Sequence, residues 1–119
     1  MKLSEIREIL EADFLVGEDK KDFEVCAGFG CDLNSDMLTF HTSGALLLTG
    51  LTNIQVLRSS FISDVKAIIF VRGKHPNQEL IEQARANGFP LMATRFTMFS
   101  ACGRLFNKGL RGVDEKMPE

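Results

Sequence analysis

The sequence predicts an α/β fold, a three-layer α/β/α domain with a mostly parallel sheet. Three short apolar runs, each followed by a stretch of helical periodicity, lead to this prediction. The runs contain Leu46, Ile68 and Leu91, at intervals of 22 and 23 residues. Strands and helices alternating at that spacing form successive βαβ units, whose strands lie parallel in one sheet.

The amino-terminal third is expected to add one or two strands and to cover one face of the sheet. Residues 3–10 carry apolar side chains at helical spacing, which predicts an amphipathic helix. Residues 14–16 predict a short extended segment, and the alternating pattern of residues 23–27 predicts a strand. That strand ends in Gly28-Phe29-Gly30, where two glycines indicate unusual dihedral angles or close approach of another group. Residues 36–41 predict a short helix.

The central stretch of the chain is Ala45–Asn53, which begins with a buried parallel strand. Thr52 with Gln55 has the form of a capping box, so the next helix is expected to begin at Thr52. Ala67–Val71 predicts a second buried strand, and Pro76 is expected at the first position of the helix that follows.

The last strand and helix complete the pattern. Phe89–Thr94 predicts a third strand, and the apolar side chains from Phe96 onward predict a final helix that fades near Gly109. We therefore expect a single domain over residues 1–110 and a flexible tail over residues 111–119.

Composition excludes several classes of protein. With 119 residues, 45% hydrophobic and 25% charged, the chain has the size and balance of one globular domain. The formal net charge is −2, so the chain lacks the excess of basic residues that is typical of a nucleic-acid binder. The charged amino terminus does not resemble a signal peptide, and no apolar run is long enough to span a membrane. We expect a cytoplasmic protein that binds neither nucleic acid nor membrane.

Polar residues follow all three predicted parallel strands at their carboxyl ends. Because those ends share one edge of the sheet, the loops are expected to meet there, where open α/β sheets bind ligands. Cationic side chains and helix amino ends favour a small anionic ligand. The predicted ligand-binding residues are Thr49, Gly50, Thr52, Asn53, Arg72, Gly73, Lys74, Thr94, Arg95 and Thr97.

The sequence predicts no catalytic residue, metal or cofactor. Cys26, Cys31 and Cys102 lack the spacing of a disulfide framework and fit free thiols. An iron–sulfur cluster with four thiolates would need one more cysteine, and zinc would need a histidine or carboxylate as its fourth ligand. His41 and His75 lie far apart in sequence, and neither neighbours a nucleophile pattern.

The run from Val71 to Thr97 resembles the DRTGG domain and the related amino-terminal domain of HPr kinase/phosphorylase. It contains, in the family's order, a strand, an Arg-Gly turn, a proline, an amphipathic helix, Gly88-Phe89-Pro90 and a strand ending in Thr94. The turn Leu48–Asn53 and the helix start at Asn34 also match, so the resemblance covers roughly residues 25–108. The motif Asp-Arg-Thr-Gly-Gly itself does not occur in this sequence.

The resemblance implies a non-catalytic regulatory or assembly domain that forms a homodimer and senses a small anionic or nucleotide ligand. Standalone chains of this kind are similar to proteins encoded beside iron-only hydrogenase and redox genes. This implies an alternative, an accessory protein with a redox-complex partner that binds a metal or iron–sulfur cluster through Cys26 and Cys31. A further alternative is an enzyme for a phosphorylated small molecule, in which Arg72, Lys74 and Arg95 would stabilise charge.

Overall fold

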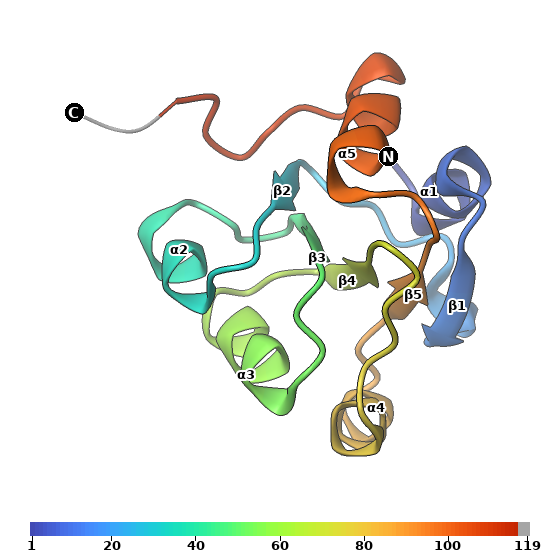
Figure 1. The fold of residues 1–119 in the computed structure, drawn as a ribbon, viewed down its shortest axis with the longest axis vertical. Coiled ribbons are helices and arrows are strands. Elements are labelled where there is room, and N and C mark those ends of the chain that lie inside the picture. The colour runs from blue at the N-terminus through green and yellow to red at the C-terminus, as the bar shows by residue number, and fades with distance from the viewer. Residues whose placement is uncertain (117–119) are drawn as a thin grey trace.

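A computed structural model of the chain describes residues 1–116. Its centre is a five-stranded sheet with the strand order β1-β5-β4-β3-β2 (Figure 1). Strand β1 runs antiparallel to β5, and the other neighbouring strands are parallel. The strands are β1 (Asp13–Val16), β2 (Gly28–Gly30), β3 (Leu46–Thr49), β4 (Ala67–Phe70) and β5 (Leu91–Ala93). The predicted α/β class with a mostly parallel sheet is confirmed.

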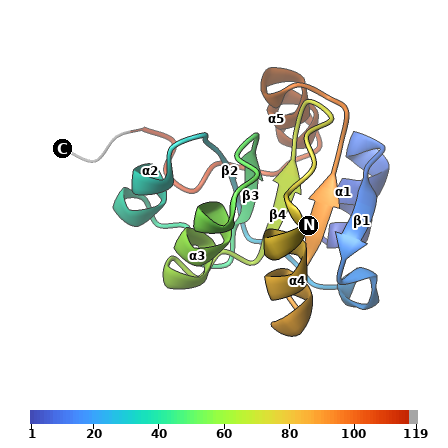
Figure 2. The ribbon, with the colours of Figure 1, turned by 60° about the horizontal axis from the view of Figure 1, so that its bottom comes forward.

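Helices cover both faces of the sheet and form its outer layers (Figures 1 and 2). Helices α1 and α5 pack together on one face, whereas α2, α3 and α4 lie on the other. Their bounds are α1 (Leu3–Leu10), α2 (Asn34–Thr39), α3 (Ile54–Ile62), α4 (Gln78–Ala86) and α5 (Met98–Asn107), with a short 3₁₀ turn η1 at Glu18–Lys20. No helix within residues 1–116 is long and apolar enough to cross a membrane.

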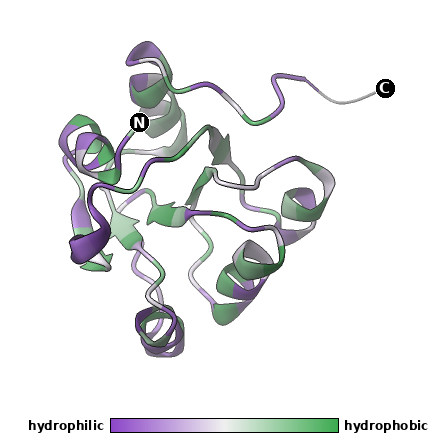
Figure 3. Ribbon diagram, turned by 180° about the vertical axis from the view of Figure 1, so that it is seen from behind, coloured by the Kyte–Doolittle hydropathy of each residue, from purple (hydrophilic) through white to green (hydrophobic). Residues whose placement is uncertain are grey.

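The three central strands are buried on both faces, which explains their unbroken apolar runs. Leu46 and Leu48 of β3 face α1 and α5, while Leu47 faces the helices on the other side. The strands are accordingly green in the hydropathy view of Figure 3, between helices that carry polar outer surfaces. Leu47 is paired with Ile68, and Ile68 with Leu91, so the second interval equals the predicted 23 residues and the first is one residue shorter than the predicted 22.

The predicted second strand is present only at its expected end, because the edge strand β2 occupies Gly28–Gly30 and the assignment of residues 23–27 to it is wrong. Val25 is buried, and its N–H donates to the carbonyl of Met1. The N–H of Cys26 donates to the carbonyl of Gly44, which lies before β3. Residues 23–26 therefore tie the amino terminus to the domain, and only Ala27 of this segment joins the sheet ladder, since its carbonyl accepts the N–H of Leu46 at 2.9 Å. The alternation of apolar side chains reflects burial of Val25 in a connecting segment.

Asparagines cap two of the helices that follow the parallel strands. The side chain of Asn53, and not that of Thr52, accepts the first hydrogen bond of α3, from Gln55 at 3.1 Å. Asn77 caps α4 in the same way, which places Pro76 before the cap and not at the first helical position. Both helix-start predictions are therefore wrong by a residue or two.

The segment after α5 returns to the outer edge of β2. The N–H of Gly28 bonds the carbonyl of Arg111 at 2.8 Å, and the N–H of Val113 bonds the carbonyl of Gly28 at 3.2 Å. The carboxylate of Asp114 accepts the backbone N–H of His41 at 3.1 Å, which lowers the pKa of Asp114. The mobility of the predicted tail stays a prediction, and its residues 117–119 lie outside the described part of the chain.

Candidate functional site at the carboxyl edge of the sheet

Loops from the carboxyl ends of β3, β4 and β5 are joined by backbone hydrogen bonds. The N–H of Val71 bonds the carbonyl of Thr49 at 2.9 Å, which links the first two loops. The N–H of Arg72 bonds the carbonyl of Phe96 at 2.8 Å, which links the second loop to the third. All ten predicted ligand-binding residues lie in these loops or at the strand ends that feed them. Their role as ligand contacts stays a prediction.

An acidic side chain, Asp32, lies at this edge of the sheet, where it contacts the loops after β3 and β4. It follows the carboxyl end of β2, and one carboxylate oxygen accepts the N–H of Gly50 at 2.7 Å and the hydroxyl of Thr49 at 3.1 Å. The other oxygen lies 3.5 Å from a guanidinium nitrogen of Arg72. The Gly50 N–H, followed by the Thr49 hydroxyl and Arg72, holds the pKa of Asp32 below its usual range.

The guanidinium of Arg72 lies directly over the Gly50 turn, in the space that a side chain at residue 50 would take. A Cβ atom at Gly50 would collide with the guanidinium of Arg72. The backbone of Arg72 is itself in the left-handed region with φ +60°, and Gly73 follows with φ +70°. The turn after β4 thus directs Arg72 back across the end of β3, toward Asp32.

Four of the predicted residues are engaged within the protein. Thr49 is buried and also accepts the N–H of Leu51, while the Asn53 side chain caps α3. The carbonyl of Thr52 accepts the N–H of Asn77 at 3.0 Å. The buried hydroxyl of Thr94 donates to the last carbonyl of α1 at 2.7 Å. These groups hold the loops in place.

The remaining predicted side chains are exposed at the edge. Lys74 and Arg95 are exposed cations in the second and third loops, and Thr97 is the exposed residue that precedes α5. Arg95 lines a shallow hollow together with Glu11 and Phe96. The edge therefore offers three cationic side chains, of which Arg72 is opposed by the carboxylate of Asp32.

Asp32 is the functional candidate that sequence reasoning missed. Once residues 28–30 are recognised as a parallel strand next to β3, residue 32 falls at the same edge as Gly50. Correct assignment of residues 28–30 as a strand would therefore have placed Asp32 at the candidate site. That strand is hard to recognise from sequence, because glycines are depleted in strands and the preceding residues 23–27 alternate in polarity as a strand does.

The cysteines lie in separate surroundings. The thiol of Cys26 bonds the carbonyl of Ser43, and that of Cys31 bonds Leu33 and the carboxylate of Asp36. Burial raises the pKa of the Cys31 and Cys102 thiols. Within residues 1–116, no group of three or more His, Cys, Asp or Glu side chains is arranged to hold a metal ion.

The fold and its edge loops define a mixed α/β domain in which strand ends present cations and backbone N–H groups. Comparison of the sequence with models of protein families finds no match, and a search of curated proteins finds none either. Among solved structures, the chain is similar to a crystal structure of the CBS and DRTGG domains from the regulatory region of Clostridium perfringens pyrophosphatase, complexed with its activator diadenosine tetraphosphate.

That similarity has a TM-score of 0.73 at 21% sequence identity. It covers 99% of this chain and 50% of the other, so the chain spans about half the length of that structure. The likeness shows that the chain shares the fold of part of that CBS and DRTGG region.

Proposed function

We propose that this chain is a non-catalytic regulatory domain that senses a small, phosphate-containing anion at the carboxyl edge of its sheet. The observation that carries the proposal is the binding of the Asp32 carboxylate by Gly50, Thr49 and Arg72. Backbone N–H groups, hydroxyls and guanidinium groups are the donors that bind phosphate oxygens. The Asp32 carboxylate thus occupies an anion-binding position, and a ligand phosphate can displace it from these donors or bind to them beside it.

Two further findings support a regulatory role. Asp32 is engaged as a hydrogen-bond acceptor and ion-pair partner, so it serves to position Arg72 and is a poor general base. The similar structure is the regulatory region of a pyrophosphatase in complex with diadenosine tetraphosphate. We infer that this chain binds a ligand of related chemistry, with Lys74 and Arg95 contacting the outer phosphates.

Isothermal titration calorimetry tests the proposal. The ligands are diadenosine tetraphosphate, ATP and pyrophosphate, with adenosine as the uncharged control. We expect saturable binding of the phosphate compounds and at least a tenfold loss of affinity in Arg72→Ala. The matched control is Arg85→Ala, which removes an exposed cation at the end of α4, before β5 and away from these loops. Absence of heat with every phosphate compound at millimolar concentration would contradict the proposal.

We also propose that the domain assembles as a homodimer through a surface of α2 and α3. Leu38 and Ile62 are 63% and 74% exposed, and both line one hollow between the ends of these helices. The residues that line the hollow include no Asp, Glu, Lys or Arg, and the nearby carboxylates of Asp64 and Asp114 are engaged by Ser43 and His41 of the lining. Exposed apolar surface of this kind is typical of an interface.

Light scattering after size-exclusion chromatography at tens of micromolar tests the dimer. We expect a dimer for the unmodified chain and a monomer for Ile62→Glu, because a charge at the centre of the interface would be buried. Phe99→Glu, in an exposed position on α5, is the control and should leave the dimer intact. A strict monomer for the unmodified chain would contradict this part of the proposal.

A further inference from the structure

Helix α5 and its flanking segments carry four cationic side chains on a chain that is acidic overall, and Glu5 and Glu24 share one hollow with two of them, Lys108 and Arg111. Residues 94–113 contain Arg95, Arg104, Lys108 and Arg111 but no Asp or Glu, whereas the whole chain has a formal net charge of −2. Two of these cations are stacked on aromatic rings, Arg104 over Phe96 at 4.0 Å and Arg111 over Phe106 at 4.1 Å. The stacking fixes the guanidinium groups beside apolar surface.

The outward face of α5 carries exposed aromatic side chains. Phe99 is 89% exposed and Phe106 is 52% exposed, while Ala101 and Leu105 on the opposite face are buried. Gly103 lies between the two phenylalanines at helical spacing, and a Cβ atom there would meet nothing within 4 Å. The outward face of α5 therefore presents two aromatic rings, with an open gap between them at Gly103.

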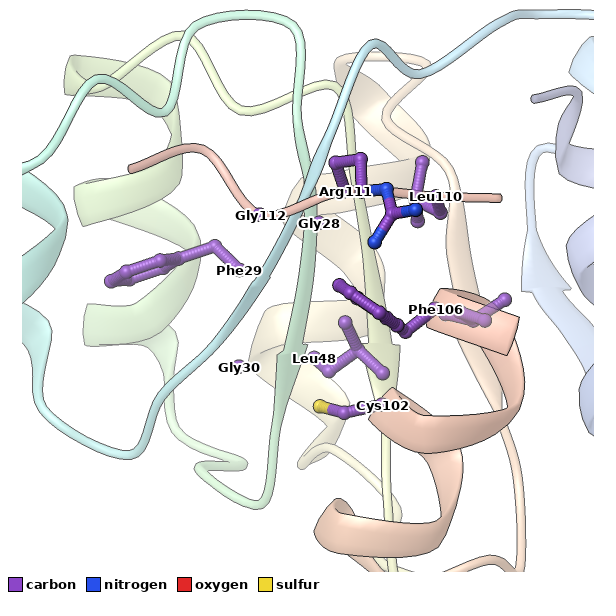
Figure 4. A pocket seen from close by; sticks show the side chains of 10 residues that line it. Gly28, Phe29, Gly30, Leu48, Cys102, Phe106, Leu110, Arg111 and Gly112 are labelled. Atoms are coloured by element: carbon purple, nitrogen blue, oxygen red, sulfur yellow. The ribbon is translucent and has the colours of Figure 1, made fainter. Parts of the chain in front are cut away.

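A cavity of about 200 Å³ lies beside this face, between α5 and strand β2 (Figure 4). Its walls include Leu48, Cys102 and Phe106, and Arg111 lies at its rim over the ring of Phe106. Pockets for drug-sized ligands measure about 300–1,000 Å³. This smaller and mainly apolar cavity suits one large apolar side chain.

We infer that this α5 face, comprising Phe99, Gly103, Phe106, Arg111 and the cavity, docks an acidic segment of another protein. An apolar side chain of that segment would enter the cavity, and its carboxylates would pair with the basic rim. Aromatic residues and arginine around a pocket are the usual centres of binding energy in protein interfaces. A second copy of this chain fits poorly, because it would bring the same cations face to face.

The inference goes beyond the proposed ligand site and does not depend on it. Fluorescence anisotropy with labelled 14-residue peptides tests it on the full chain. Each peptide carries one central Leu, Ile or Phe, flanked by Glu and Asp in one series and by Lys and Arg in the other. We expect the acidic series to bind, with at least a tenfold loss of affinity in Phe99→Ala and in Phe106→Ala. Phe61→Ala, which alters an exposed ring on α3, should bind unchanged.

Amide NMR spectra locate the bound peptide and confirm that each variant is folded. We expect shifts at Gly28, Gly30 and Gly103, which line the cavity or the gap. Equal binding of the acidic and basic series, or no binding of either at millimolar concentration, would overturn the inference. Binding to phosphatidylserine vesicles that Phe99→Ala abolishes, with inert peptides, would assign the face to membranes. Self-association lost in Phe99→Ala would assign it to a second copy.

Discussion

The charge of Asp32 sets how strongly the carboxyl edge binds an anion. Asp32→Asn keeps an oxygen for the Gly50 N–H and the Thr49 hydroxyl but removes the negative charge 3.5 Å from Arg72. We therefore expect the variant to bind pyrophosphate more tightly than the unmodified chain.

The size of the effect follows from distance and exposure. Two unit charges about 4 Å apart interact by about 1 kcal/mol in water and about 4 kcal/mol at an effective dielectric constant of 20. The Asp32 and Arg72 side chains are 44% and 43% exposed, so the lower figure applies. About 1 kcal/mol corresponds to an approximately fivefold gain in affinity.

Calorimetric titration with pyrophosphate at low salt measures this gain. The matched control is Asp19→Asn, which removes an exposed carboxylate in η1 without a change at the carboxyl edge. We expect an approximately fivefold gain in pyrophosphate affinity in Asp32→Asn alone, and a smaller gain at high salt because salt screens the charge. An unchanged or weaker affinity in Asp32→Asn would refute it.

Other predictions concern stability and turn geometry. Because hydrogen bonding lowers the pKa of Asp32, its contribution to stability is present above the ordinary value of 3.8 and is lost as the pH falls through the lowered value. Urea midpoints of the unmodified chain and Asp32→Asn should therefore converge in acid. Gly50→Ala should displace the flexible Arg72 side chain and weaken pyrophosphate binding, at a cost of less than about 1 kcal/mol in stability. Gly73→Ala meets no neighbour but strains a backbone at φ +70°, so it should cost about 1–2 kcal/mol in urea unfolding. Thr94→Val leaves the buried carbonyl at the end of α1 unpaired, and we expect a loss of about 1–3 kcal/mol in the same assay.

The parallel strands could be predicted from the sequence because each is buried on both faces. Ala67–Phe70 and Leu46–Leu48 are continuous apolar runs, too short for a helix and each followed by a helical pattern, which favours a strand buried on both faces. The bounds of strand β2 could not be predicted in this way. Its sequence Gly-Phe-Gly forms a short edge strand, where the glycines let Cys102 and Leu110 approach, so packing and not propensity determines it.

The three loops of the candidate site were predicted correctly in position, because strand order fixes where they meet. Their internal contacts were not predictable, since they depend on pairing between distant segments. Asp32 reaches Gly50 only because β2 lies beside β3, and Thr94 is buried only because α1 returns over the end of β5. Residues that look alike in sequence, such as Thr94 and Thr97, therefore differ in exposure.

An amide NMR titration with diadenosine tetraphosphate tests the central claim most directly. We predict saturable shifts at Gly50, Arg72 and Arg95, and none at Gly88, which lies in the loop between α4 and the start of β5, at the opposite end of the sheet. Shifts confined to the cavity beside α5, or no shifts at millimolar ligand, would contradict an anion site at the carboxyl edge.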